Sequence, residues 1–272
     1  MRTTSTIQHL ASTLEVAHWS PSLESRDGPT IFLLHEGLGC VEMWKDFPQR
    51  LADRLRLPVI AYSRAGYGGS STIDLPRSLD YMQREADDVL PDLLQALCDG
   101  PRVLLGHSDG ASIALAYAGA HHDPLLTSVV AIAPHVVVEA IATAAIQGAK
   151  EQFTAGTLAS KLARYHRANL TSAFWGWNDA WLDPDFRTFS ILDRLDTIAV
   201  PVLALQGTED EYGTSMQLEL IASSVAETTL ILIQEAKHSP HLTHTDRVLD
   251  AIERFLDQRG ILVPKVTGSP PR

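Results

Sequence analysis

Cysteine is scarce in this chain of 272 residues, which contains only Cys40 and Cys98, far apart in the sequence. The chain has no C-x-x-C spacing, so neither a disulfide framework nor a zinc site is predicted. A chain of this kind is typical of a reducing compartment. We therefore expect a cytoplasmic protein without a metal ion.

Basic charge and long apolar runs are also lacking. The chain carries 22 Lys and Arg against 33 Asp and Glu, a formal charge of −11. Nucleic acids and anionic membranes bind basic surfaces that neutralise phosphate, so neither is an expected partner. No run of eighteen apolar residues occurs, and the first twenty residues contain no signal-peptide core. A membrane span and a targeting segment are therefore not expected.

Apolar residues, in contrast, make up 45% of the chain, enough to fill a sizeable core. Short apolar runs with little alternation are typical of strands buried on both faces of a parallel sheet. Such runs occur at Ile31–Leu34, Val59–Tyr62, Val103–Leu105, Ser128–Ala133, Val202–Leu205 and Thr229–Ile233. Helical patterns lie between them, at Trp44–Leu55, Tyr81–Leu97, Ser108–Ala120 and Val248–Leu256. This alternation predicts the α/β class with an open sheet.

The alternation stops once, between residues 139 and 196, where the sequence is helical or irregular and holds three of the five tryptophans. We interpret this segment as a helical cap inserted into one α/β core. The predicted organisation is 1–138 and 197–262 for the two parts of the core, 139–196 for the cap and 263–272 for a flexible tail. A small helical subdomain with its own core is the alternative for the insertion.

The strongest motif is Gly106-His107-Ser108-Asp109-Gly110, a G-x-S-x-G pattern between an apolar strand and a helix of small residues. A serine on a tight strand-to-helix turn projects its hydroxyl above the sheet, and the glycines prevent clashes in that turn. The amides at the start of the helix favour negative charge on a substrate. Ser108 is therefore the predicted nucleophile, and His107 is interpreted as a packing residue.

A nucleophilic serine needs a base, and the base needs an orienting carboxylate. Two later apolar strands end in loops that carry Asp210 and His238. Both loops open at the sheet edge that carries Ser108, which is where open α/β folds bind ligands. Glu209 and Glu211 flank Asp210, so each remains an alternative acid.

Two other site types receive little support. His238, His241 and His244 recur every third residue, but Pro240 prevents the helix in which histidines four residues apart would hold a metal. A glycine-rich stretch from residue 66 to 71 lacks the third glycine of a dinucleotide loop. No metal, nucleotide or other cofactor is expected.

Two further motifs make the chain resemble an α/β-hydrolase from about residue 12 to residue 258. His35-Glu36-Gly37-Leu38-Gly39 resembles the H-G-x-x-G oxyanion loop, and the segment from Ser63 to Ser70 resembles the R-G-x-G-x-S turn. Glu36 stands where the family has its second glycine, which leaves open whether Gly37 or Leu38 supplies an oxyanion amide. Ala65 also replaces a glycine, but neither departure removes a reacting group.

This resemblance implies a mostly parallel, doubly wound sheet of about eight strands with a helical cap. It implies Ser108 as nucleophile, Asp210 as acid, His238 as base, and an oxyanion hole formed by Asp109 with Gly37 or Leu38. The expected reaction is hydrolysis of an ester-like bond through an acyl-enzyme. Carbon–carbon bond hydrolases, lactonases and thioesterases use the same groups. A receptor that binds a small molecule without turnover is the alternative from another class.

The substrate pocket is expected beneath the cap, where aromatic side chains would wall a small, partly apolar ligand. Its predicted substrate-binding residues are Glu36, Trp175, Trp177 and Trp181. Acidic residues gather on the catalytic loops, so we expect an electronegative mouth that disfavours anionic substrates. The expected partners are this small molecule and, at most, a second copy of the chain in a homodimer.

Overall fold

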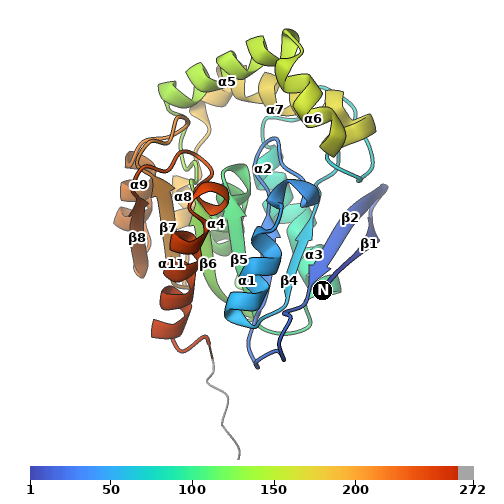
Figure 1. Ribbon diagram of the computed structural model, residues 1–272. Helices are drawn as coiled ribbons and strands as arrows, with labels where there is room; N and C mark the ends of the chain where they lie inside the picture. The colour runs from blue at the N-terminus through green and yellow to red at the C-terminus, as the bar shows by residue number, and fades with distance from the viewer. Residues whose placement is uncertain (263–272) are drawn as a thin grey trace, which may run out of the picture.

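An eight-stranded sheet forms the centre of the computed structural model, which describes residues 1–262 (Figure 1). The spatial order is β1-β2-β4-β3-β5-β6-β7-β8; β2 runs antiparallel to both neighbours, and all pairs from β4 to β8 are parallel. The predicted tail, 263–272, lies outside the described residues. The strands are β1 (Arg2–His9), β2 (Ser12–Trp19), β3 (Thr30–Leu34), β4 (Val59–Tyr62), β5 (Arg102–His107), β6 (Leu126–Ile132), β7 (Val202–Gly207) and β8 (Thr228–Ile233).

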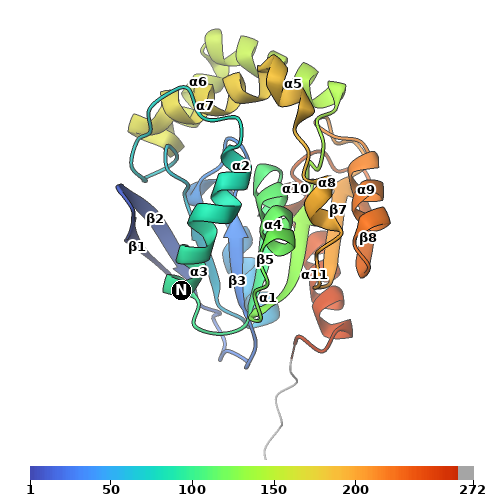
Figure 2. The ribbon, with the colours of Figure 1, turned by 180° about the vertical axis from the view of Figure 1, so that it is seen from behind.

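Helices cover both faces of this sheet, which confirms the doubly wound α/β class. Helices α1 and α11 lie on one face (Figure 1), and α3, α4, α8 and α9 lie on the other (Figure 2). The helices are α1 (Phe47–Leu55), α2 (Tyr81–Arg84), α3 (Leu90–Leu97), α4 (Asp109–Ala120), α5 (Ala140–Thr154), α6 (Thr157–His166), α7 (Leu170–Leu182), α8 (Leu192–Leu195), α9 (Met216–Ser224), α10 (Pro240–Thr243) and α11 (Thr245–Gln258). Shorter turns are η1 (Val41–Trp44), η2 (Glu85–Val89), η3 (Arg167–Asn169) and η4 (Pro184–Thr188).

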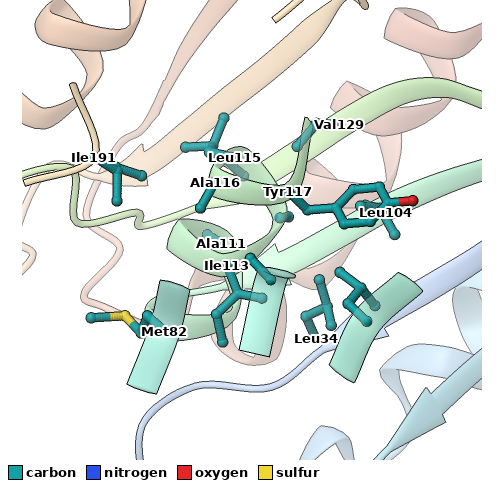
Figure 3. Close-up of a cluster of buried hydrophobic side chains, with 14 of the residues drawn as sticks. Leu34, Met82, Leu104, Ala111, Ile113, Leu115, Ala116, Tyr117, Val129 and Ile191 are labelled. Atoms are coloured by element: carbon teal, nitrogen blue, oxygen red, sulfur yellow. The ribbon is translucent and has the colours of Figure 1, made fainter. Parts of the chain in front are cut away.

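The two faces of the sheet bury separate apolar clusters. Figure 3 shows the larger one, where α4 packs on β3 and β5 through small and branched side chains. Helix α4 is buried all round, from Asp109 to Ala118, because α2, α8 and the sheet enclose it. Alanine and glycine on this helix allow the close approach that places its first turn directly behind β5.

The β1–β2 hairpin is the part of the sheet that apolar patterning did not reveal. Strand β1 is exposed over most of its length and consists largely of threonine, serine and other polar residues. An edge strand with solvent on both faces needs no apolar run, so it gives no such signal. Each of the six predicted apolar runs corresponds to a strand of the sheet, and only Ala133 lies beyond its strand, one residue after the end of β6.

Helices α5, α6 and α7 of the segment from residue 139 to 196 lie side by side and form an arch over the carboxyl ends of the parallel strands (Figures 1 and 2), whereas α8, at the end of the segment, packs against α4 on a face of the sheet. Two polar residues fasten this cap to the core. His166 Nε2 donates to the carbonyl of Leu38 over 2.9 Å, and Asn169 Nδ2 donates to the carbonyl of Ser70 over 2.7 Å. Within residues 1–262 no helix has both the length and the apolar character to cross a bilayer.

Candidate active site

Ser108 lies on a sharp turn between β5 and α4. Its φ of 53° and ψ of −120° place a non-glycine residue in a strained conformation, which the packed strand and helix maintain. A Cβ on Gly106 would lie 2.1 Å from the carbonyl oxygen of Gly110, and a Cβ on Gly110 would lie 2.0 Å from that of Leu34. Only glycine at both positions allows the helix to start this close to the sheet.

Backbone amides surround the space above Ser108. The N–H of Asp109 is the first of α4 and has no partner within the helix. Gly37 and Leu38 follow β3 and line the same cavity. In the described part of the chain neither of their amides makes a backbone hydrogen bond. The geometry therefore leaves both Gly37 and Leu38 available beside Asp109.

Asp210 is the carboxylate that meets His238. Nδ1 of His238 lies 2.9 Å from Oδ1 and 3.0 Å from Oδ2 of Asp210. Burial opposes ionisation of Asp210, but the hydrogen bond and charge of His238 and the N–H of Tyr212 hold the pKa of Asp210 below its ordinary value. Glu211 instead accepts the main-chain N–H of His238 over 3.2 Å, and Glu209 is exposed. The alternative acids therefore do not face the imidazole.

Ser108 and His238 line one cavity of about 250 Å³ beneath the cap. Within residues 1–262 no hydrogen bond joins the Ser108 hydroxyl to His238 Nε2. Catalytic hydrogen bonds are often long without substrate and tighten when it binds. Among the described residues, Nε2 of His238 has no hydrogen-bond partner, whereas Nδ1 is held by Asp210.

The cap contributes Trp177 and Trp181 to the cavity, whereas Trp175 does not line it. In α7, Trp177 and Trp181 are four residues apart and share a face, but Trp175 is displaced by two residues onto another face. Trp175 packs edge-on against Phe153, with ring centroids 5.6 Å apart. Predicted residues Glu36, Gly37, Leu38, Ser108, Asp109 and His238 all line the cavity.

His135 is a cavity residue that the sequence analysis missed. It follows β6, so it lies at the same sheet edge as Ser108, and its ring centroid is 5.7 Å from that of His238. Burial, together with the nearby charge of His238, lowers the pKa of His135 to about 3. Nδ1 of His135 is buried without a hydrogen-bond partner among the described residues. The sequence signal that could have pointed to His135 was its position just after the apolar strand β6.

A chain of hydrogen bonds runs from the cap to Asp109. Trp181 Nε1 donates to the hydroxyl of Tyr81 over 3.1 Å, and that hydroxyl donates to Asp109 Oδ2. Burial raises the pKa of Asp109, although the charge of Arg64 and the Tyr81 hydrogen bond oppose this rise. In the described structure Asp109 Oδ1 is buried without a hydrogen-bond partner. This chain of hydrogen bonds fixes the side chain of Asp109, the residue that follows Ser108.

The acidic residues are only partly gathered at the cavity. Glu36, Asp109 and Glu211 line it, together with one cation, Lys237. Three other acids on these loops lie outside the lining: Glu209 and Glu235 are exposed, and Asp210 is buried against His238.

The three regularly spaced histidines do not converge. His238 is held by Asp210, His241 is buried against aromatic rings, and His244 bonds a neighbouring threonine. Across residues 1–262 no group of three or more His, Cys, Asp or Glu side chains is arranged to hold a metal ion.

Comparison with known proteins gives the same architecture. The sequence model of the alpha/beta hydrolase family matches residues 31–251. Serine hydrolase BPHL of Mus musculus is 26% identical over 226 residues, which span 78% of this chain and 74% of that protein. Its Homo sapiens counterpart is 27% identical over 211 residues, spanning 73% and 69%.

Among solved structures, proline iminopeptidase of Mycobacterium smegmatis has a TM-score of 0.73 at 18% identity, covering 96% of this chain and 100% of that one. The enol-lactonase of Burkholderia xenovorans LB400 has a TM-score of 0.70 at 16% identity, covering 93% and 100%. Identities this low show a shared fold and carry no information on substrate. The family match takes in most of the chain, and this protein therefore belongs to the alpha/beta hydrolase family.

Proposed function

We propose that this chain is a serine hydrolase that cleaves an ester-like bond of a small molecule through an acyl-enzyme. The observation that carries the proposal is the 2.9 Å contact between His238 Nδ1 and Asp210 in the cavity that holds Ser108. A binding protein has no need of a strained serine, an oriented imidazole and a buried carboxylate at one sheet edge.

In the proposed reaction Ser108 Oγ attacks the substrate carbonyl carbon, and its proton passes to Nε2 of His238. Asp210 accepts the hydrogen bond from Nδ1, which fixes the tautomer and stabilises the imidazolium. His238 then gives the proton to the leaving oxygen, and the acyl group remains on Ser108. A water molecule, deprotonated by His238, releases the acid in the second half of the reaction.

The oxyanion that forms in each half is stabilised by backbone amides. The N–H of Asp109 at the start of α4 is one donor, and the N–H of Gly37 or Leu38 is the other. Removing one such donor in a serine protease costs about 100-fold or more in kcat, which indicates the size of this contribution.

The cavity favours a small substrate with an apolar part. The cavity volume of about 250 Å³ lies just below the usual range for ligand pockets, so a short acyl or aryl group fits better than a long chain. Its apolar walls come from Leu38, Ile146, Trp177, Trp181 and Tyr212. Thioesters, lactones and activated carbon–carbon bonds present the same carbonyl to Ser108 and are the alternative substrates.

Substrate charge is a second element of the proposal. Three carboxylates and one ammonium group line the cavity, so neutral substrates are preferred to carboxylates. Matched neutral and carboxylate-bearing esters, compared at low salt, test this preference. Faster turnover of the anionic series contradicts it.

Covalent labelling tests the catalytic assignment. A fluorophosphonate probe is expected to label the wild type and Ser223→Ala, which alters an exposed serine, but not Ser108→Ala. A panel of esters, thioesters and lactones then ranks bond types by kcat/KM. Failure of the folded wild type to label or to hydrolyse any member of the panel contradicts the proposal and favours the receptor alternative.

A further inference from the structure

The protonation of a buried histidine follows from what its two ring nitrogens face. A neutral imidazole has one donor and one acceptor nitrogen. His35 Nδ1 donates to the carbonyl of Glu36 over 2.7 Å, and its Nε2 accepts the N–H of Arg64 over 3.1 Å. His166 likewise has one acceptor and one N–H opposite its two nitrogens. Burial lowers the pKa of both rings, and the neutral form satisfies every contact.

His107 is different because both of its nitrogens face acceptors. Nε2 lies 2.8 Å from the main-chain carbonyl oxygen of His238, and Nδ1 lies 3.4 Å from Oε2 of Glu36. If the ring of His107 were neutral, with its one N–H at Nε2, and Glu36 were ionised, the lone pair of Nδ1 would face a lone pair of Oε2. One further proton must therefore lie between Nδ1 of His107 and Oε2 of Glu36.

Other titratable groups surround this pair. The His107 ring centroid is 5.1 Å from that of His238 and 4.5 Å from that of His241. Burial and the charges of His107, His238 and Lys45 hold the pKa of His241 well below its ordinary value, so this ring is neutral. Burial is the largest single effect on Glu36 and opposes its ionisation, but the hydrogen bond and charge of His107, a backbone hydrogen bond and the charge of Arg64 together lower the pKa of Glu36. These surroundings favour an ionised Glu36 that accepts a hydrogen bond from Nδ1 of His107.

The second role of His107 is to hold the loop that carries the proposed base. The main chain of His238 has two side-chain anchors, Glu211 on its N–H and His107 on its carbonyl oxygen. Nearby residues of this loop, Glu235 and Lys237, are exposed. The His107 contact therefore helps to determine where Nε2 of His238 lies relative to Ser108.

We propose that Glu36 and His107 form a proton-sharing pair that positions His238 through its main-chain carbonyl. Both are positioning residues for the reaction, and this inference rests on the function proposed above. The pair is neutral as a whole, so the excess of negative charge that disfavours anionic substrates comes from Asp109 and Glu211, which outnumber Lys237 in the lining. This pair gives a positioning role to Glu36, which stands where the family has its second glycine.

Two substitutions separate the contacts of His107. In His107→Gln the side-chain amide nitrogen can take the place of Nε2 and donate to the carbonyl of His238. In His107→Asn the shorter side chain places its amide nitrogen near the position of Nδ1, where it reaches Glu36 only. For a 4-nitrophenyl ester we expect kcat to fall about tenfold or more in His107→Asn with KM little changed. His107→Gln should recover kcat to within about threefold of the wild type. Equal kcat values for the two folded variants overturn the positioning role.

The shared proton is tested without any activity measurement. In ¹⁵N-histidine spectra of the wild type near neutral pH, Nδ1 of His107 is expected to carry or share a hydrogen. In Glu36→Gln the amide donates instead, so Nδ1 should become a pure acceptor. A bare Nδ1 in the wild type overturns the shared proton, even if His107→Asn fails to fold. Absence of fluorophosphonate labelling in the wild type contradicts the proposed function, and the spectra remain decisive for the pair.

Discussion

The indole of Trp177 occupies the space that a side chain on Gly37 would need. A Cβ on Gly37 would lie 2.2 Å from Trp177 Nε1 and 3.1 Å from Asp109 Oδ2. The cap and the proposed oxyanion loop therefore fit each other only while residue 37 is glycine. The positions of the loop and of the cap are therefore linked at this contact, in addition to the hydrogen bond from His166 to the carbonyl of Leu38.

Gly37→Ala should impair the reaction more than it impairs folding. The added methyl group must displace the loop or the Trp177 indole, and a displacement of about 1 Å at reacting groups can cost about 100-fold in kcat/KM. Ester kinetics and thermal melting check this expectation. Gly148→Ala in α5 is the matched control, because a Cβ there meets nothing within 4 Å. Wild-type kinetics in Gly37→Ala would show that the contact is irrelevant to the reaction.

Asp210→Asn should lower kcat by about three to four orders of magnitude with little effect on folding. The asparagine amide can donate to Nδ1 of His238, which moves the imidazole proton to Nε2, where it blocks transfer from Ser108. Single-turnover kinetics with an activated ester measure the loss. Glu209→Gln, which changes the exposed neighbouring acid, should keep activity close to wild type. A similar loss in both variants would contradict the assignment of Asp210.

His135 should make the protein less stable in acid. Its pKa is lowered to about 3 in the folded state by burial, so below about pH 6.5 the unfolded chain binds a proton that the folded chain does not. Between pH 7.5 and 5.0 this one group should remove about 2 kcal/mol from the free energy of unfolding.

Urea denaturation at the two pH values measures the effect. His135→Gln should show a smaller acid-dependent loss than the wild type, and His122→Gln, at an exposed position, should show the same loss as the wild type. Equal losses in His135→Gln and the wild type would mean that His135 is not held neutral.

Trp181→Ala should raise KM, whereas Trp175→Ala should not. Trp181 faces the cavity and loses both apolar contact with substrate and its hydrogen bond to Tyr81. Removal of a large apolar contact of this kind corresponds to a KM about ten- to 100-fold higher. Trp175 packs within the cap against Phe153, so its loss should affect melting temperature only. A raised KM in Trp175→Ala would show that the cap as a whole shapes the cavity.

The fold class could be predicted because strands buried on both faces must be apolar along their whole length. Strands β5 and β7 carry this apolar signal in consecutive residues, and the signal does not depend on how the loops are arranged. The β1–β2 hairpin carries none, because β1 is exposed and pairs only through its backbone. In the cap, the spacing within α7 separates Trp175 from Trp177 and Trp181, but only once the helix is known.

The sequence by itself determined the turn at Ser108, because the steric demands of that turn are met by Gly106 and Gly110 within a few residues. It also determined that an acid and a histidine reach the same sheet edge, since parallel strands end there. Tertiary structure alone decided that Asp210 faces His238, that His135 enters the cavity, and that His107 contacts the main chain of His238, 131 residues away in the sequence. Such contacts depend on distances between segments far apart in the chain, and no local pattern encodes them.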